Sequence, residues 1–296
     1  MADKEWMIQD CFTPKTQIIS ITDDLGYTFS EDREEEYDLL SSKISHDTGI
    51  KKADIYSSVN KSYLSHWHSI DDEWYYFKCG GDYFHFIREL LGEVISEYYR
   101  LDTVHYQIAK IERFGQEQYG IISKNFYEKD EKYKRAWDYG ICLKRGLSLF
   151  QDLWLICPNR ENSNFLSIDL KKMMVRDFYS LEGDRMSYNF LFHVDKKKEI
   201  RLAPLYDYSL SFENIRPLYR SEIGEINLND KECIKQLKND ATFQILFQQL
   251  MESKMEDFLN EVENRHHIQI PGDDCYYFTK YEKDMKKMLQ KRKVIT

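Results

Sequence analysis

Three polar residues in the second half of the chain have the types and the order that phosphoryl transfer needs. Asp184 and Asn189 are separated by four residues in "GDRMSYNF", and Asp207 follows in "LAPLYDYSL". A carboxylate can orient an attacking hydroxyl, while an amide and a second carboxylate supply oxygen ligands of the kind that Mg²⁺ prefers. The Asp-x-x-x-x-Asn spacing often arises by chance, and Asp207 alone could be a turn former at the end of a strand. The ordered set is therefore the signal, and the remaining members of such a site should lie upstream.

A lysine and a row of glutamates lie upstream in that order. Lys78 follows three aromatic residues in "YYFKCGG", where burial of a lysine is expensive unless it has a partner. The alternative is an edge-strand lysine that faces water. Glu89, Glu93 and Glu97 then share one face of a predicted helix, because they are four residues apart. We take Glu93, which lies in mid-helix, as the partner of Lys78, with Glu97 as the second choice.

The elements predicted around these residues change in character near residue 126. Before it, the sequence predicts a solvated helix or loop over 30–49, an amphipathic helix over 84–101, and strands over 16–22, 73–79, 104–114 and 118–126. After it, helical periodicity dominates, with helices over 169–181 and 240–265. We interpret the apolar face of the segment 240–265 as core. Strands over 190–194 and 199–207 would form a hairpin that brings Asn189 and Asp207 together at its open end. This segregation predicts an α+β fold with an N-lobe (1–126) and a helical C-lobe (127–296).

Composition excludes several classes of function. The net charge of −9 argues against nonspecific nucleic-acid binding. No apolar stretch reaches the length of a signal peptide or of a membrane span. The six cysteines form no Cys-x-x-Cys pair, which is typical of a reduced, cytoplasmic protein, and a host-delivered effector without a classical signal peptide would look the same. The histidines in "HWH" and "HH" lack metal-ligand spacing and are interpreted as surface or capping residues.

The segment "GDRMSYNFLF" followed by "LAPLYDYSLSF" resembles the catalytic and metal-binding segments of HipA-like serine/threonine kinases. These form an atypical branch of the kinase fold that is also similar to phosphatidylinositol kinases. Within it, "GEVISEYY" and "YGIISKNF" most resemble the small secreted kinases of the Helicobacter type. The resemblance covers about residues 55–215. It implies a two-lobed protein-kinase-like fold that uses ATP and Mg²⁺ to phosphorylate a serine or threonine of a protein substrate.

The resemblance also implies a role for each matched residue. Asp184 would be the catalytic base, and Asn189 and Asp207 would hold Mg²⁺. Lys78 would bind the α- and β-phosphates of ATP and pair with Glu93. The segment 122–126 would be the hinge whose backbone meets adenine, with three residues named as binding ATP: Ser123, Lys124 and Phe126.

The loop expected to cover the phosphates is "YSSVNKSYLS", residues 56–65, which contains no glycine. Its predicted ATP-binding residues are Ser57, Ser58, Asn60 and Lys61. Its predicted autophosphorylation sites are Ser57, Ser58 and Ser62. The alternative is an ordinary polar loop. This loop, together with Met186 where the branch often has histidine, motivates a second hypothesis of a pseudokinase that acts as a protein-binding module. A third is a small-molecule or lipid kinase on the same fold.

Overall fold

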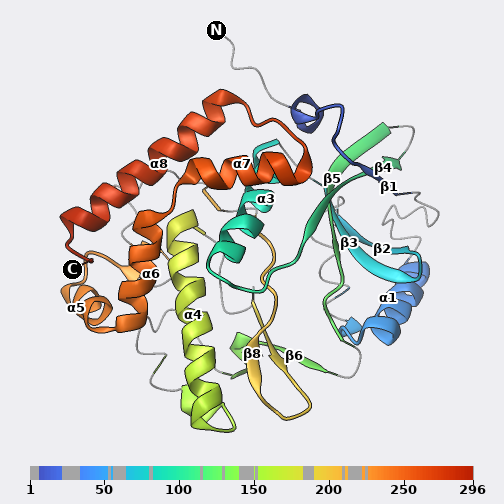
Figure 1. Cartoon of the computed structure of the whole chain (residues 1–296). Helices are drawn as coiled ribbons and strands as arrows, with labels where there is room; N and C mark the ends of the chain where they lie inside the picture. The colour runs from blue at the N-terminus through green and yellow to red at the C-terminus, as the bar shows by residue number, and fades with distance from the viewer. Residues whose placement is uncertain are drawn as a thin grey trace. The chain divides into compact units, whose positions relative to one another are not determined.

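The computed structural model describes residues 7–21, 34–52, 55, 65–79, 83–113, 116–128, 131–139, 150, 153–182, 190–208, 211–212, 222–223 and 226–295. The chain divides into two compact units. Figure 1 labels the helices and strands along the chain. Unit 1 comprises Met1–Ile87, Val104–Tyr133 and His266–Gln269, and unit 2 comprises Arg88–Thr103, Lys134–Arg265 and Ile270–Thr296. The lobe boundary predicted between residues 126 and 127 stays a prediction.

A five-stranded sheet in the order β1-β4-β5-β3-β2 runs through unit 1. Its strands are β1 (Ile19–Ile21), β2 (Ser65–Ile70), β3 (Glu73–Cys79), β4 (Tyr106–Arg113) and β5 (Gln116–Lys124). β1 pairs with β4 in parallel, and the other pairs are antiparallel. The predictions of β1, β3, β4 and β5 are confirmed near their expected bounds, because β-branched and aromatic residues are dense in all four.

The sequence did not predict β2. His68 lies buried in it, with its ring 6.2 Å from that of Phe77, so its interpretation as a surface or capping residue is wrong.

Two apolar clusters in unit 1 contain residues of this sheet. One unites Ile21, Phe77, Ala109, Ile111 and Ile122 from four of the strands. The other contains Trp74 of β3 and the helix α1 (Glu34–Thr48) through Leu40 and Ile44, together with Ile50 and Ile55. The segment 30–49 thus includes a helix with one buried face. A 3₁₀ turn, η1 (Ile8–Cys11), precedes β1.

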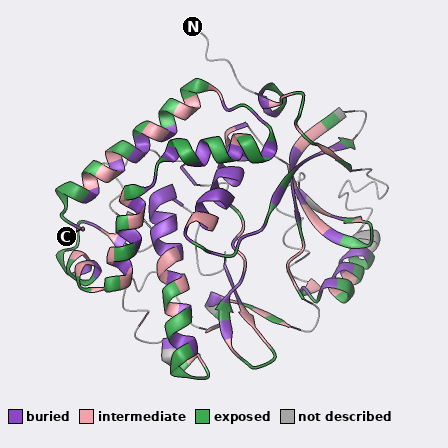
Figure 2. Ribbon diagram, in the orientation of Figure 1, coloured by how far each residue is buried: buried purple, intermediate pink, exposed green. Residues whose placement is uncertain are grey.

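Helix α3 (Tyr83–Tyr98) confirms the amphipathic helix predicted from the apolar spacing over 84–101. Residues 86–96 are all buried, the glutamates at 89 and 93 included (Figure 2). A helix that buries carboxylates along with its apolar face must supply each of them with a partner.

Unit 2 is mainly helical. Its helices are α4 (Arg160–Ser180), α5 (Lys231–Asn239), α6 (Ala241–Glu252), α7 (Met255–His266) and α8 (Gly272–Lys291), with 3₁₀ turns η3 (Ala136–Tyr139) and η5 (Leu153–Leu155). Side-chain caps define three of the starts: Asn159 accepts from the Asn162 N–H, Asp230 from Glu232 and Asp240 from Thr242 and Phe243. Such caps satisfy backbone donors that have no partner within the helix.

The single helix predicted over 240–265 is wrong, because the structure has two helices, α6 and α7, across that segment. Ser253 ends α6 in an extended conformation, with φ −63° and ψ 157°, and its hydroxyl donates to the Leu250 carbonyl. The predicted face is core, as expected, and its buried members are Phe243, Leu246, Phe247, Leu250, Phe258 and Val262. The apolar periodicity continues across the break, which is why the sequence did not reveal it.

The predicted hairpin is present but shorter than expected. β7 (Leu191–Val194) pairs antiparallel with β8 (Ile200–Leu202), in a sheet of order β6-β7-β8 that also contains β6 (Lys132–Arg135). Two further strands, β9 (Glu222–Ile223) and β10 (Ile226–Asn227), form a separate pair. The strand predicted to run to residue 207 ends at Leu202, so Asp207 is not a strand-end residue.

The predicted α+β fold class is confirmed. Among the residues that the structure describes, no helix has the length and apolarity needed to cross a membrane.

Candidate active site

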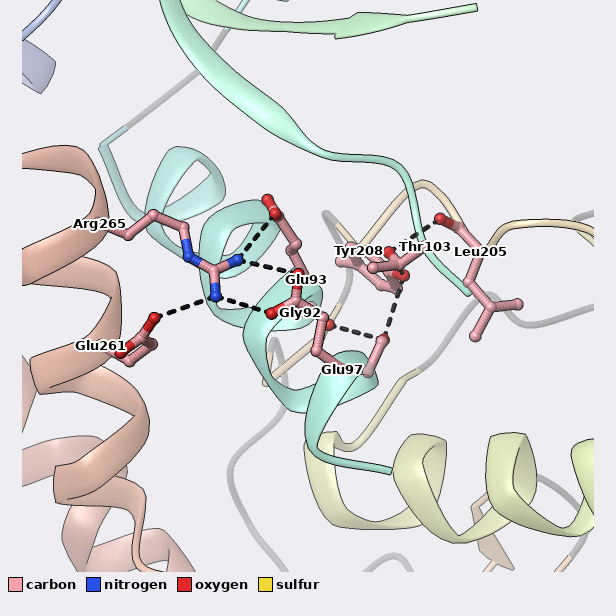
Figure 3. Close-up of polar contacts among 9 residues, drawn as sticks. Gly92, Glu93, Glu97, Thr103, Leu205, Tyr208, Glu261 and Arg265 are labelled. Atoms are coloured by element: carbon pink, nitrogen blue, oxygen red, sulfur yellow. Dashed lines mark hydrogen bonds and ion pairs between the residues drawn. The ribbon is translucent and has the colours of Figure 1, made fainter. Parts of the chain in front are cut away.

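The three glutamates of α3 have two sets of partners in unit 2. Glu89, 2% exposed, accepts the backbone N–H of Tyr208 at 2.9 Å. Glu93, 1% exposed, accepts from Arg265 of α7 at 3.0 Å, and Glu97 accepts from the same guanidinium at 3.0 and 2.7 Å (Figure 3). Equal spacing on one helix face has therefore produced two separate environments: Glu89 contacts the segment after Asp207, while Glu93 and Glu97 contact α7.

Arg265 joins α3 to α7. Its guanidinium also donates to Glu261, one turn earlier on α7, at 3.0 Å. The hydrogen bond to Glu97 raises the pKa of Arg265 above its ordinary value, although partial burial lowers it. The arginine therefore stays charged at every pH at which the protein would be assayed, and it neutralises a buried carboxylate in the middle of α3.

The segment that leads to Asp207 is held along residues 102–103. Leu205 forms an isolated parallel bridge with Thr103, and its N–H donates to the Asp102 carbonyl at 2.8 Å. The Thr103 hydroxyl donates to the Leu205 carbonyl at 3.1 Å and is 2.6 Å from the Tyr208 hydroxyl (Figure 3). The backbone on both sides of Asp207 is thus fixed by hydrogen bonds.

Asp207 itself is exposed and has a left-handed backbone, with φ 58°. A non-glycine residue in this region costs on the order of 1–3 kcal/mol and persists only where its surroundings impose it. Here the contacts of Leu205 and Tyr208 impose it. The result is a carboxylate presented to solvent from a rigid backbone, and its oxygens fit Mg²⁺.

Lys78 lies on β3 in unit 1, with a partly buried side chain. It is opposite Ser65 of β2 and Ile121 of β5. The alternative of an edge-strand lysine is wrong, because β3 has a strand on each side. The predicted role of Lys78 toward ATP phosphates stays a prediction, as does its pairing with Glu93.

The predicted hinge residues lie on β5 and directly after it. Ser123 is buried and lies opposite Tyr76 and Tyr106. Lys124 forms an exposed ion pair with Glu73 at 3.1 Å, which contributes little to stability. The ring of Phe126 stacks on Tyr127 at 4.8 Å, and the Phe126 carbonyl accepts from the Tyr133 hydroxyl at 3.1 Å. Their contact with adenine remains a prediction.

Several predicted site residues lie outside the described residues. They are Ser57, Ser58, Asn60 and Lys61 of the predicted phosphate loop, the candidate phosphosite Ser62, Met186, the predicted base Asp184 and the predicted metal ligand Asn189. Asp184 comes two residues after Glu182, the last described residue of that stretch.

The sequence reasoning did not identify Tyr208 and Arg176, and it passed over Glu89. Tyr208 follows Asp207 directly, is fully buried, and accepts Arg176 against its ring at 4.2 Å. A signal for Arg176 was present, because "MMVRDFYSL" places a charged pair inside an otherwise apolar helical run. No comparable signal separates Glu89 from Glu93, since both lie on the same face.

Comparisons with known proteins find relatives only among solved structures. No family model matches the chain, and no curated protein matches it in sequence. The chain is similar to a bacterial kinase and to a protein of a bacterial toxin–antitoxin system. The first is the proinflammatory kinase CtkA of Helicobacter pylori, at 13% identity and a TM-score of 0.41, over 77% of this chain and 90% of that chain. The second is HipA of Shewanella oneidensis MR-1, solved with HipB and operator DNA, at 12% identity and a TM-score of 0.47, over 74% of this chain and 58% of that chain. HipA gives its name to the family that the sequence resembles. Such low identity assigns no activity.

Proposed function

We propose that the chain is an ATP- and Mg²⁺-dependent serine/threonine protein kinase that also autophosphorylates. The observation that supports this best is the arrangement at 207–208. Asp207 presents a carboxylate from a strained, left-handed backbone, and buried Glu89 holds the next residue by its N–H. Backbone strain of this kind concentrates at functional sites. A rigid, exposed carboxylate at such a position is well suited to hold a metal ion.

In the proposed reaction, a substrate hydroxyl oxygen bonds to the γ-phosphorus of ATP while the bond to the bridging oxygen breaks and ADP leaves. Asp184 accepts the proton of the hydroxyl. Asp207 and Asn189 would hold Mg²⁺, which would supply positive charge to neutralise the phosphate oxygens. Lys78 neutralises the non-transferred phosphates. Because phosphoryl transfer depends on placement rather than on covalent chemistry, the backbone contacts on both sides of Asp207 contribute directly to the rate.

The contacts of α3 favour Glu89 as the helix glutamate that organises this site. The Glu93 carboxylate accepts a hydrogen bond from Arg265, and this contact fixes α3 to α7. The Glu89 carboxylate instead reaches the residue next to the proposed metal ligand. The sequence-based choice of Glu93 as the partner of Lys78 remains a prediction, and separate leucine variants of Glu89 and Glu93 distinguish the two residues.

The direct test is transfer of radiolabel from the γ-position of ATP to the chain itself and to a generic protein acceptor. Asp184→Ala and Asp207→Ala should each abolish Mg²⁺-dependent transfer. Asp273→Ala, which removes an exposed aspartate in the first turn of α8, should leave it unchanged. Transfer that survives both site substitutions undiminished would refute the assigned roles.

Two other outcomes correspond to the alternative functions. If calorimetry shows no Mg²⁺-dependent binding of ATP and no transfer occurs, the chain is a pseudokinase that acts through protein binding. If ATP is consumed but the phosphate is transferred only to a small molecule or a lipid, the chain is a small-molecule or lipid kinase. Phosphoproteomics after expression of the wild type and of Asp184→Ala would identify the protein substrate.

A further inference from the structure

A buried arginine in unit 2 contacts two segments next to proposed site residues: the end of α4, shortly before Asp184, and the residue that follows Asp207. Arg176, near the end of α4, has no exposed surface. Its guanidinium donates to Asp177 at 2.8 Å and to the Gly92 carbonyl at 3.3 Å, and it forms an ion pair with Glu182 at 3.6 Å. Its centre also lies 4.2 Å from the ring centroid of Tyr208. One cation thus meets α3, the end of α4 and the residue after Asp207.

Two of the segments that Arg176 contacts, the end of α4 and the segment after Asp207, are also bonded to each other. The Ser211 hydroxyl donates to Glu182 at 2.6 Å, and the N–H of Phe212 donates to the Ser180 carbonyl at 2.7 Å. Ser211 in turn donates its N–H to the Tyr208 carbonyl at 2.9 Å. The chain just before Asp184 and the chain just after Asp207 are therefore one hydrogen-bonded assembly, and Arg176 lies within it.

Close approach of Tyr208 to α3 completes the assembly. A Cβ on Gly92 would lie 2.3 Å from the Tyr208 Cγ, so only glycine permits the ring to lie there. The Tyr208 hydroxyl accepts a hydrogen bond from the Ser96 hydroxyl at 3.1 Å, and the Tyr208 backbone N–H donates to Glu89. The ring is held at its edge by these polar contacts and across its face by Arg176. Movement of the cation would therefore move Tyr208 and, with it, Asp207.

A buried ion pair is weak evidence for stability, because well-packed apolar residues of similar volume often stabilise a protein equally well or better. The contacts of Arg176 are better explained by a role in positioning neighbouring residues than by a contribution to stability. Its planar, forked guanidinium can meet a carboxylate, a carbonyl and an aromatic face at once, which the ammonium of lysine cannot do. We propose that Arg176 is a positioning residue that sets the place of Asp207 relative to Glu182, two residues before the proposed base Asp184 in the sequence, through its contacts with Tyr208 and Glu182. The proposal rests on the kinase function proposed above.

The test compares Arg176→Lys with Lys171→Met in the Mg²⁺-dependent transfer assay. Lys171 is a matched control on the same helix, because it too is a largely buried cation, paired with Asp240 at 2.5 Å and placed over the rings of Phe150 and Phe243. These three partners lie outside the assembly that Arg176 forms with Glu182 and Tyr208, so Lys171→Met should alter stability but not the rate. Arg176→Lys should lower kcat roughly 100-fold, the scale of a displacement of about 1 Å, and should raise the Mg²⁺ concentration for half-maximal rate.

The Mg²⁺ concentration for half-maximal rate distinguishes a residue that positions Asp207 from one that only stabilises the fold. A purely structural arginine would lower the rate in proportion to the folded fraction and leave the half-saturating Mg²⁺ concentration unchanged, which would overturn the proposal. Where Arg176→Lys does not fold, Tyr208→Leu removes the ring that the cation contacts and keeps the buried charge. It should raise the Mg²⁺ requirement more than Tyr208→Phe does, and equal requirements would overturn the proposal. A wild type without any transfer refutes the kinase function itself, whereas an active wild type with an unaltered Arg176→Lys refutes only the positioning role.

Discussion

Removal of the Arg265 guanidinium gives the sharpest test of how α3 is held. Arg265→Met keeps most of the side-chain volume and removes the charge that Glu93, Glu97 and Glu261 share. The three pairs differ in burial: Glu93 is 1% exposed, Glu97 32% and Glu261 50%. Exposed pairs contribute about 0–1 kcal/mol each, whereas loss of one partner of a fully buried pair costs about 3–5 kcal/mol.

The expected loss lies between these limits. Arg265 is itself 29% exposed, so water can reach the space it vacates and part of the cost at Glu93 is recovered. We therefore expect Arg265→Met to lower the free energy of unfolding by about 2–3 kcal/mol. Glu261→Gln, which removes a half-exposed pair one turn away, should lower it by about 0.5 kcal/mol.

Urea denaturation followed by circular dichroism measures both losses as shifts of the midpoint. A double-mutant cycle with Glu93→Gln isolates the buried pair and should give a coupling of at least about 1 kcal/mol. Equal losses in Arg265→Met and Glu261→Gln, or additive effects in the cycle, would refute the reasoning that burial of Glu93 dominates.

Three further predictions follow from other contacts. Glu89→Leu should lower kcat/KM for phosphoryl transfer by about 100-fold and Glu93→Leu by far less, because only Glu89 accepts a hydrogen bond from Tyr208; equal losses in steady-state assays would contradict this. Gly92→Ala should lower the free energy of unfolding by about 1–3 kcal/mol through its contact with Tyr208, whereas Gly272→Ala, with nothing within 4 Å, should not; urea midpoints compare them. Burial raises the pKa of the Cys11 thiol from 9.0 to about 12, so the folded state keeps a proton that the unfolded state releases. Stability should therefore fall by about 1.4 kcal/mol per pH unit between these two values, and Cys11→Ala should flatten that slope in denaturation series on either side of pH 9.

Local patterns were sufficient for most of the elements around the site. Strand β3 and helix α3 follow from aromatic density and from apolar spacing, both of which depend on neighbours within a few residues. The predicted strand to residue 207 was too long because the apolar alternation continues through Leu205. What ends β8 at Leu202 is the contact of Leu205 with Asp102 and Thr103, about a hundred residues earlier in the chain.

Order along the chain alone predicted which kinds of polar groups the site would contain: a lysine on a strand, a glutamate on the next helix, then an aspartate, an amide and a second aspartate. Spacing of four residues also determined that Glu89 and Glu93 share a helix face. Only the tertiary structure decided which partner each carboxylate meets, because those partners are 119 and 172 residues away in the sequence. Local sequence sets the direction in which a side chain points, whereas burial of its charge depends on segments that reach it only when the chain has folded.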